Sequence, residues 1–75
     1  MSRLRLTFRE FTNIIESHGF VLERQEGSHK HYRCGEGPVV RLVTVAGHRG
    51  IDVIKPGTLT SMIRQSGLSK AAFRK

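Results

Sequence analysis

The sequence predicts an α+β sandwich in which a three-stranded antiparallel sheet carries two helices on one face, in the order α-β-β-β-α. Apolar residues recur at helical spacing near both ends of the chain, and three strand-like segments with short turns between them fill the middle. A chain of 75 residues has room for one small hydrophobic core. We therefore expect a single domain spanning residues 1–75.

A capping-box pattern marks the start of the first helix. Thr7 and Glu10 stand three residues apart, so each side chain can satisfy a free backbone amide of the other residue. Apolar residues follow at helical spacing, and Gly19 suits a left-handed C-terminal cap. The first helix is therefore expected from Phe8 to His18.

Three segments of the middle region have the composition of strands. Residues 20–26 alternate apolar and polar side chains, and Gly27 and Ser28 form a tight turn directly after them. A second strand is expected at residues 29–34 and, after a turn rich in glycine, a third at residues 39–45, where β-branched residues dominate. Consecutive strands joined by such short turns form an antiparallel meander.

Alternation divides the side chains of the second strand between two faces of the sheet. Tyr32 and Cys34 are expected to meet the helices, because burying two imidazoles and a guanidinium without partners would be costly. We therefore expect His29, His31 and Arg33 to remain accessible on the other face.

A loop of residues 46–55 separates the sheet from the second helix. Pro56 suits the first turn of that helix, an apolar stripe follows, and Gly67 closes it. Ser69 can cap one last turn that ends at Phe73 and folds back onto the core. This order of elements is that of the double-stranded RNA-binding-domain type of sandwich, although a fold alone says little about function.

The chain is strongly basic, and the excess charge is unevenly placed. Its 13 Lys and Arg residues outnumber 6 Asp and Glu residues, for a formal net charge of +7. Residues 1–52 contain eight basic and six acidic side chains, whereas residues 53–75 contain five basic side chains and no acidic one. Because cations that neutralise phosphates release condensed counterions, this asymmetry favours nucleic acid or an acidic protein as the partner, the alternative being a solvated basic surface.

The sequence predicts neither a disulfide nor a metal site nor a membrane segment. Cys34 is the single cysteine, which suits a reducing cytoplasm. A zinc site of His29, His31 and Cys34 is not expected, since Cys34 would face away from the two histidines and a fourth ligand is missing. No apolar run approaches the roughly 20 residues of a membrane helix, and the N-terminus lacks the apolar core of a signal peptide. We expect a cytoplasmic protein that uses no cofactor.

His29 is the candidate for chemistry, because it stands at the start of a predicted strand directly after the Gly27-Ser28 turn. RNA carries its own nucleophile, the 2′-hydroxyl, so strand scission needs proton transfer and charge stabilisation at one phosphate. A histidine can donate or accept that proton near neutral pH. A Ser28–His29 hydrolase is not expected, because adjacent residues of an extended chain point to opposite faces and no acid has a spacing that would orient the imidazole. The pattern therefore favours RNA over DNA as the substrate.

Further polar residues could hold RNA near this histidine. The candidate contacts are Lys30, His31, Arg33, Arg41, His48, Arg49 and Lys55. His31 shares the predicted face of His29 and is the candidate for the second proton transfer. Lys55 stands at the start of the second helix, where free amides and the helix dipole attract anions, although ordinary capping explains the same residues.

Three segments with characteristic spacing cover nearly the whole chain. They are Gly27-Ser28-His29 followed by Tyr32, residues 43–45 leading to His48, and residues 57–59 leading through Ile63 to residues 67–69. Taken together, these segments resemble HicA (YcfA-like) toxins of type II toxin–antitoxin modules. The chain departs from the family pattern at Ala46-Gly47, where a proline often precedes the loop histidine, and in its extra arginines near the N-terminus.

This resemblance implies a ribosome-independent mRNA interferase with a double-stranded RNA-binding-like fold, a single catalytic histidine at His29 and no metal. It also implies a HicB antitoxin as the partner, which in this family covers the active face of the toxin and often carries a DNA-binding domain. From the residues alone, two alternatives stay open. One is a non-catalytic RNA-binding module that uses the same basic face, and the other is a protein-interaction domain whose basic helix binds an acidic partner.

Overall fold

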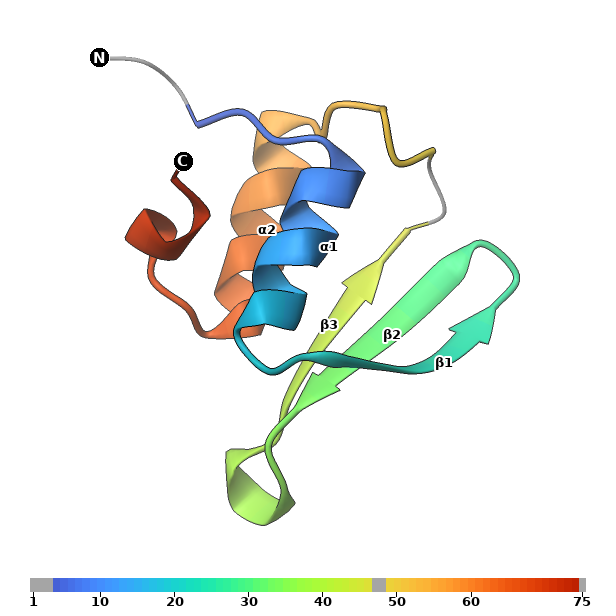
Figure 1. Cartoon of the computed structure of the whole chain (residues 1–75), viewed down its shortest axis with the longest axis vertical. Helices are drawn as coiled ribbons and strands as arrows, with labels where there is room; N and C mark the ends of the chain where they lie inside the picture. Colours follow the sequence, from blue (N-terminus) through green and yellow to red (C-terminus); the bar gives the residue numbers. More distant parts are fainter. Residues whose placement is uncertain (1–3, 47–48, 75) are drawn as a thin grey trace.

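The structure is a computed structural model that describes residues 4–46 and 49–74 of the chain. Its elements, in chain order, are α1 (Phe8–Ser17), β1 (Val21–Glu26), β2 (His29–Cys34), the 3-10 turn η1 (Gly37–Val39), β3 (Arg41–Val45), α2 (Pro56–Ser66) and the 3-10 turn η2 (Lys70–Phe73). The three strands form one antiparallel sheet in the order β1-β2-β3, and both helices lie on the same side of it (Figure 1). The predicted α-β-β-β-α fold is therefore confirmed.

Three element boundaries differ from the prediction. β1 begins at Val21 rather than at residue 20. α1 ends at Ser17 with His18 as its cap, one residue before the expected end. β3 begins at Arg41 rather than at residue 39, because the amides of Val39 and Val40 donate to carbonyls at η1 instead of to β2.

Local and distant hydrogen bonds hold the start of α1. The Thr7 amide donates to Oε1 of Glu10 at 2.8 Å, and the Glu10 amide donates to Oγ1 of Thr7 at 3.1 Å, which is the predicted capping box. The Arg9 amide donates to the carbonyl of Gly50 at 3.0 Å, so the segment before α2 is tied to the start of α1. At the other end of the helix, Gly19 has a φ of 93°, the left-handed conformation expected of the cap.

The hydrophobic core lies between the two helices and one face of the sheet. Its buried apolar residues are Leu6, Phe8, Phe11, Ile15, Phe20, Tyr32, Val43, Val45, Ile54, Leu59, Met62 and Phe73. The ring of Phe73 in η2 stacks on that of Phe11 in α1, with centroids 5.1 Å apart and an interplanar angle of 12°. The last turn therefore folds back onto the core, as predicted.

β1 lies at one edge of the sheet and outside the core. All of its residues are exposed, and its register with β2 shifts between Leu22 and Arg24. Leu22 pairs with Tyr32 on the helix side, whereas Arg24 pairs with His31 on the open side. The simple alternation predicted for residues 20–26 is therefore wrong beyond Leu22, because a bulge adds one residue to β1.

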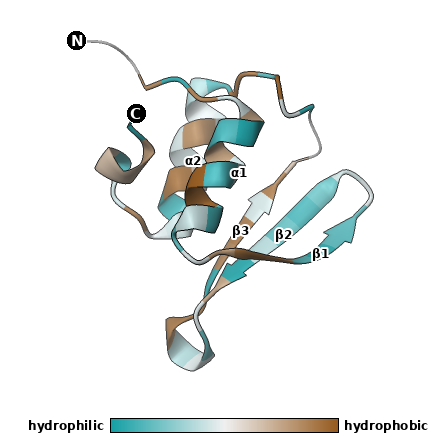
Figure 2. Cartoon of the chain, viewed as in Figure 1, coloured by the Kyte–Doolittle hydropathy of each residue, from teal (hydrophilic) through white to brown (hydrophobic). Residues whose placement is uncertain are grey.

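The end of the β1–β2 hairpin is the polar part of the sheet. Figure 2 shows hydrophilic residues along β2 and the second half of β1, while β3 is more apolar.

Among the described helices, none has the length and apolar character needed to cross a membrane.

Candidate functional site

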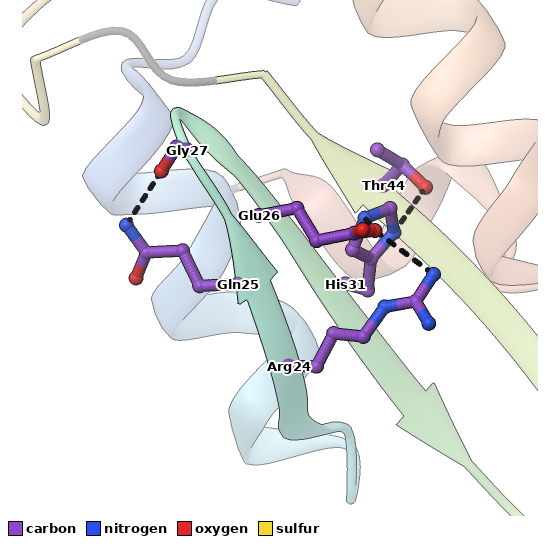
Figure 3. Close-up of polar contacts among 6 residues, drawn as sticks. All are labelled: Arg24, Gln25, Glu26, Gly27, His31 and Thr44. Atoms are coloured by element: carbon purple, nitrogen blue, oxygen red, sulfur yellow. Dashed lines mark hydrogen bonds and ion pairs between the residues drawn. The ribbon is translucent and has the colours of Figure 1, made fainter.

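His29 is the first residue of β2 and is exposed at the end of the hairpin. Glu26 and His29 are Cα partners in the antiparallel pairing, so Gly27 and Ser28 form the whole turn between the strands. Gly27 has a φ of 58° whereas Ser28 has no positive φ, which is the pattern of a type II′ turn. The side-chain amide of Gln25 donates to the Gly27 carbonyl at 3.1 Å and braces the turn (Figure 3). The structure thus holds His29 at a defined place.

A network of polar side chains lies on the open face of the sheet, beside His29. Oε1 of Glu26 is 3.0 Å from Nη2 of Arg24 and 3.3 Å from Nε2 of His31. The other ring nitrogen of His31, Nδ1, is 3.1 Å from Oγ1 of Thr44 in β3. Figure 3 shows these four side chains converging on one face, so that the network crosses all three strands.

Both ring nitrogens of His31 lie close to protein groups, but only Nδ1 is hydrogen-bonded. Its side chain is only 24% exposed, and Nε2 is shielded from solvent. Nε2 lies close enough to Glu26 for an ion pair with a protonated imidazole. The contact does not have the geometry of a hydrogen bond. Because Glu26 and Thr44 flank the two nitrogens, His31 offers neither of them to a substrate in this arrangement. The second proton transfer by His31 stays a prediction, and it would require one of these nitrogens to leave its present contact.

Glu26 is a candidate residue that sequence reasoning does not single out. Glu26 precedes His29 by only three residues, which is not a spacing that marks a catalytic triad. The signal that identifies it is the turn itself. Two strands joined by two residues pair residue 26 with residue 29, which brings their Cβ atoms to about 5 Å. A carboxylate beside the histidine thus follows from the hairpin rather than from a motif.

Lys30 faces the helix side and lines a polar groove of about 260 Å³. The groove is lined by Phe8, Arg9, Thr12, Asn13, Lys30, Val45, Ala46 and Gly50. Lys30 is exposed there, although it follows His29 directly in the chain. The hairpin end therefore carries the imidazole on one side and a cationic groove on the other.

Arg33 and Arg41 lie toward the other end of the sheet. Arg33 is half-buried in β2, and Arg41 pairs with Cys34, so the two lie about 13 and 16 Å along the strand direction from His29. The guanidinium of Arg41 crosses over Gly67 at the end of α2, where a Cβ would collide with it. The structure does not bring these two predicted contacts to the histidine.

The remaining predicted contacts precede α2. Arg49 is exposed, and its Nη2 lies 3.6 Å from Oδ1 of Asp52. Lys55 is the exposed N-cap residue of α2 and makes no side-chain cap bond. It lines a different groove, which it shares with Arg5. His48 lies outside the described residues.

Tyr32 and Cys34 point toward the helices, as predicted. Burial raises the pKa of the Tyr32 phenol, the charge of Glu16 raises it further, and a hydrogen bond with Thr12 acts in the opposite direction. The half-buried Cys34 directs its Sγ toward the His18 carbonyl, 3.7 Å away. Within the described part of the chain, no group of three or more His, Cys, Asp or Glu side chains could hold a metal ion.

Together these features define a small, basic α+β protein with an α-β-β-β-α fold, whose exposed His29 lies between the polar network around Glu26 and a cationic groove. A family model described as HicA toxin of bacterial toxin-antitoxin matches residues 8–68. The chain therefore belongs to the HicA toxin family, in agreement with its resemblance, and a toxin of such a module implies a cognate antitoxin. A comparison with curated proteins gives no match.

Proposed function

We propose that this HicA toxin is an endoribonuclease that cleaves mRNA in the cytoplasm and thereby blocks translation. The proposal depends above all on the placement of His29, an exposed imidazole at the hairpin end, opposite Glu26 and next to Lys30. An imidazole exchanges protons near neutral pH, and a nearby ammonium can stabilise the charge that develops on a phosphate.

The cleavage step consists of one bond exchange and two proton transfers. The 2′-oxygen loses its proton and attacks the adjacent phosphorus, and the bond from phosphorus to the 5′-oxygen breaks as that oxygen gains a proton. The products are a 2′,3′-cyclic phosphate and a new 5′-hydroxyl end. His29 is the general base for the first transfer or the general acid for the second, and neither role requires a metal ion.

The partner that controls this activity is proposed to be a HicB-like antitoxin that covers the His29 face. His29, Glu26 and Arg24 are all exposed, so a protein seated on this side of the hairpin would bury them together. RNA could then no longer reach the imidazole.

The test compares the wild-type protein with His29→Ala on the same mRNA, with the new 5′ ends mapped. Removal of a proton-transfer group should slow cleavage by about 10²–10⁴-fold. Because His29 is exposed, the thermal unfolding midpoint should hardly move. His18→Gln is the matched control, since His18 is also exposed but caps the far end of α1, and it should cleave like the wild type.

Two results would count against this function. A folded His29→Ala variant that cleaves as fast as the wild type would refute the assigned chemistry. Wild-type protein that binds RNA with steep salt dependence, yet forms no new ends at any concentration, would favour a non-catalytic RNA-binding module instead.

A further inference from the structure

The polar groove on the helix side of the sheet has a chemistry of its own. Arg9 from α1 and Lys30 from β2 are its two cations, and both are exposed. Thr12 and Asn13 add a hydroxyl and a carboxamide, and none of the described residues that line the groove is acidic. The groove is thus positive, and its two cationic side chains offer only hydrogen-bond donors.

Among the described residues, no carboxylate forms an ion pair with either cation of this groove. The ion pairs among the described residues join Glu26 to Arg24 and His31, and Asp52 to Arg49, and they include neither Arg9 nor Lys30. The carboxylate nearest to Arg9 in the sequence, that of Glu10, is engaged by the Thr7 amide. Unpaired cations in a concave site attract an anion, because the low-dielectric walls focus their field.

Arg9 is anchored against Gly50. Its amide donates to the Gly50 carbonyl at 3.0 Å. A Cβ added at Gly50 would lie 3.2 Å from Nε, 3.3 Å from Cβ and 3.4 Å from Nη2 of Arg9. The arginine side chain therefore lies across bare backbone, which leaves no room for a larger residue without displacement. Such prior ordering reduces the entropy that a ligand must remove on binding.

We propose that this groove binds an RNA backbone phosphate that neighbours the phosphate at His29, with Arg9 and Lys30 as its cationic ligands. The inference rests on the proposed function. His29 and Lys30 are adjacent in β2 and leave opposite faces, so they flank the end of the hairpin. An RNA strand cleaved at His29 crosses that end and brings its next phosphates to the groove.

The chemistry and the size of the groove both fit a phosphate. A guanidinium donates two parallel hydrogen bonds to phosphate oxygens, and an ammonium adds a point charge. The volume of about 260 Å³ lies below the roughly 300–1,000 Å³ of small-molecule pockets, so the groove suits a phosphate and its sugar rather than a whole cofactor. The Asn13 carboxamide can donate to ribose oxygens.

The test is a binding measurement on a fluorescent 2′-O-methyl oligoribonucleotide, which keeps every phosphate but has no free 2′-hydroxyl to attack. Arg9→Gln and Lys30→Gln should each weaken binding about ten-fold, the effect of losing one charge-assisted hydrogen bond. Each should also reduce the slope of log affinity against log salt by about 0.7, the value for one contact to a single strand. Arg64→Gln, which removes an exposed cation in the last turn of α2, is the matched control.

The inference is overturned if both groove variants have the affinity and salt slope of Arg64→Gln. It is also overturned if they lose affinity for the antitoxin while RNA binding is unchanged, since the groove would then hold an acidic protein side chain. Arg9→Lys keeps the charge but cannot donate two parallel hydrogen bonds to one phosphate, so it should bind RNA with intermediate affinity. This variant replaces Arg9→Gln if Arg9→Gln does not fold. Because no cleavage is measured, this result is independent of whether His29→Ala abolishes activity.

Discussion

Glu26 and His29 face each other in the pair of residues that closes the β1–β2 hairpin, and the Glu26 carboxylate also lies 3.3 Å from Nε2 of His31. His31 continues the connection to Thr44 in β3, whose amide donates to Oε1 of Gln65 in α2 at 3.2 Å. An unbroken series of polar contacts therefore links the hairpin end to the helix layer. His29 is exposed, but its strand partner Glu26 is held in place by these contacts.

Glu26→Gln should lower the rate of RNA cleavage by up to about 100-fold, because catalytic geometry tolerates little displacement. The substitution keeps the shape of the side chain but removes the charge that Arg24 and His31 share. The free energy of unfolding should change by less than about 1 kcal/mol, as is usual for exposed ion pairs. Initial cleavage rates and thermal unfolding measure the two effects. Glu23→Gln on the same strand should retain the wild-type rate, and an equal rate in both variants would remove Glu26 from the site.

His31→Gln should affect stability more than chemistry. It disrupts the bond to Thr44 and the contact with Glu26, so the free energy of unfolding should fall by about 1 kcal/mol, the usual net value of a hydrogen bond. Urea unfolding gives this value. Loss of a proton-transfer group slows a reaction by about 100-fold or more. The cleavage rate of this variant should fall by much less. A loss of that size in a folded variant would identify His31 as the second proton-transfer group after all.

Gly27→Ala should destabilise the protein by about 1–2 kcal/mol, the cost of holding an L-residue at positive φ. An added Cβ would meet no atom within 4 Å, so the loss comes from the backbone alone. Gly27→Asn should lose less, because asparagine is favoured in such turns. Urea unfolding should rank the wild type first, then Asn, then Ala, and cleavage should follow the same order because the turn places His29. Equal stability of the two variants would contradict the assigned turn geometry.

Tyr32→Phe should remove a pH-dependent part of the stability. The folded-state pKa of Tyr32 is raised above 10.0, chiefly because burial disfavours the phenolate. The stabilising contribution of the neutral phenol is therefore fully present below about pH 10 and is lost as the pH rises through the raised value. Urea unfolding between about pH 8 and pH 11 should show the wild type losing stability more steeply than the variant. Parallel curves would contradict the burial of an ionisable phenol in the core.

Local sequence signals were sufficient for the helices and for the placement of His29. The Thr7–Glu10 box and Gly19 delimit α1, because caps and helical periodicity depend on residues only a few positions apart. The same holds for the two-residue turn that places His29 at the start of β2. The burial of Tyr32 was predicted because burying the polar residues on the other face of the strand would be costly, and the structure confirms it. Fold class, turn and candidate histidine could thus be predicted from the sequence.

Long-range packing decided what surrounds that histidine. The bulge in β1 turned Arg24 to the open face, and no local pattern marks which strand residue will lose its partner. The cationic groove depends on Arg9, Lys30 and Gly50 meeting from three distant segments. Arg41, equally basic in the sequence, was carried to the far end of the sheet. Local patterns in the chain therefore predict the elements and the position of His29. The neighbours of His29 depend on long-range packing, because side chains distant in the chain meet only when the core packs.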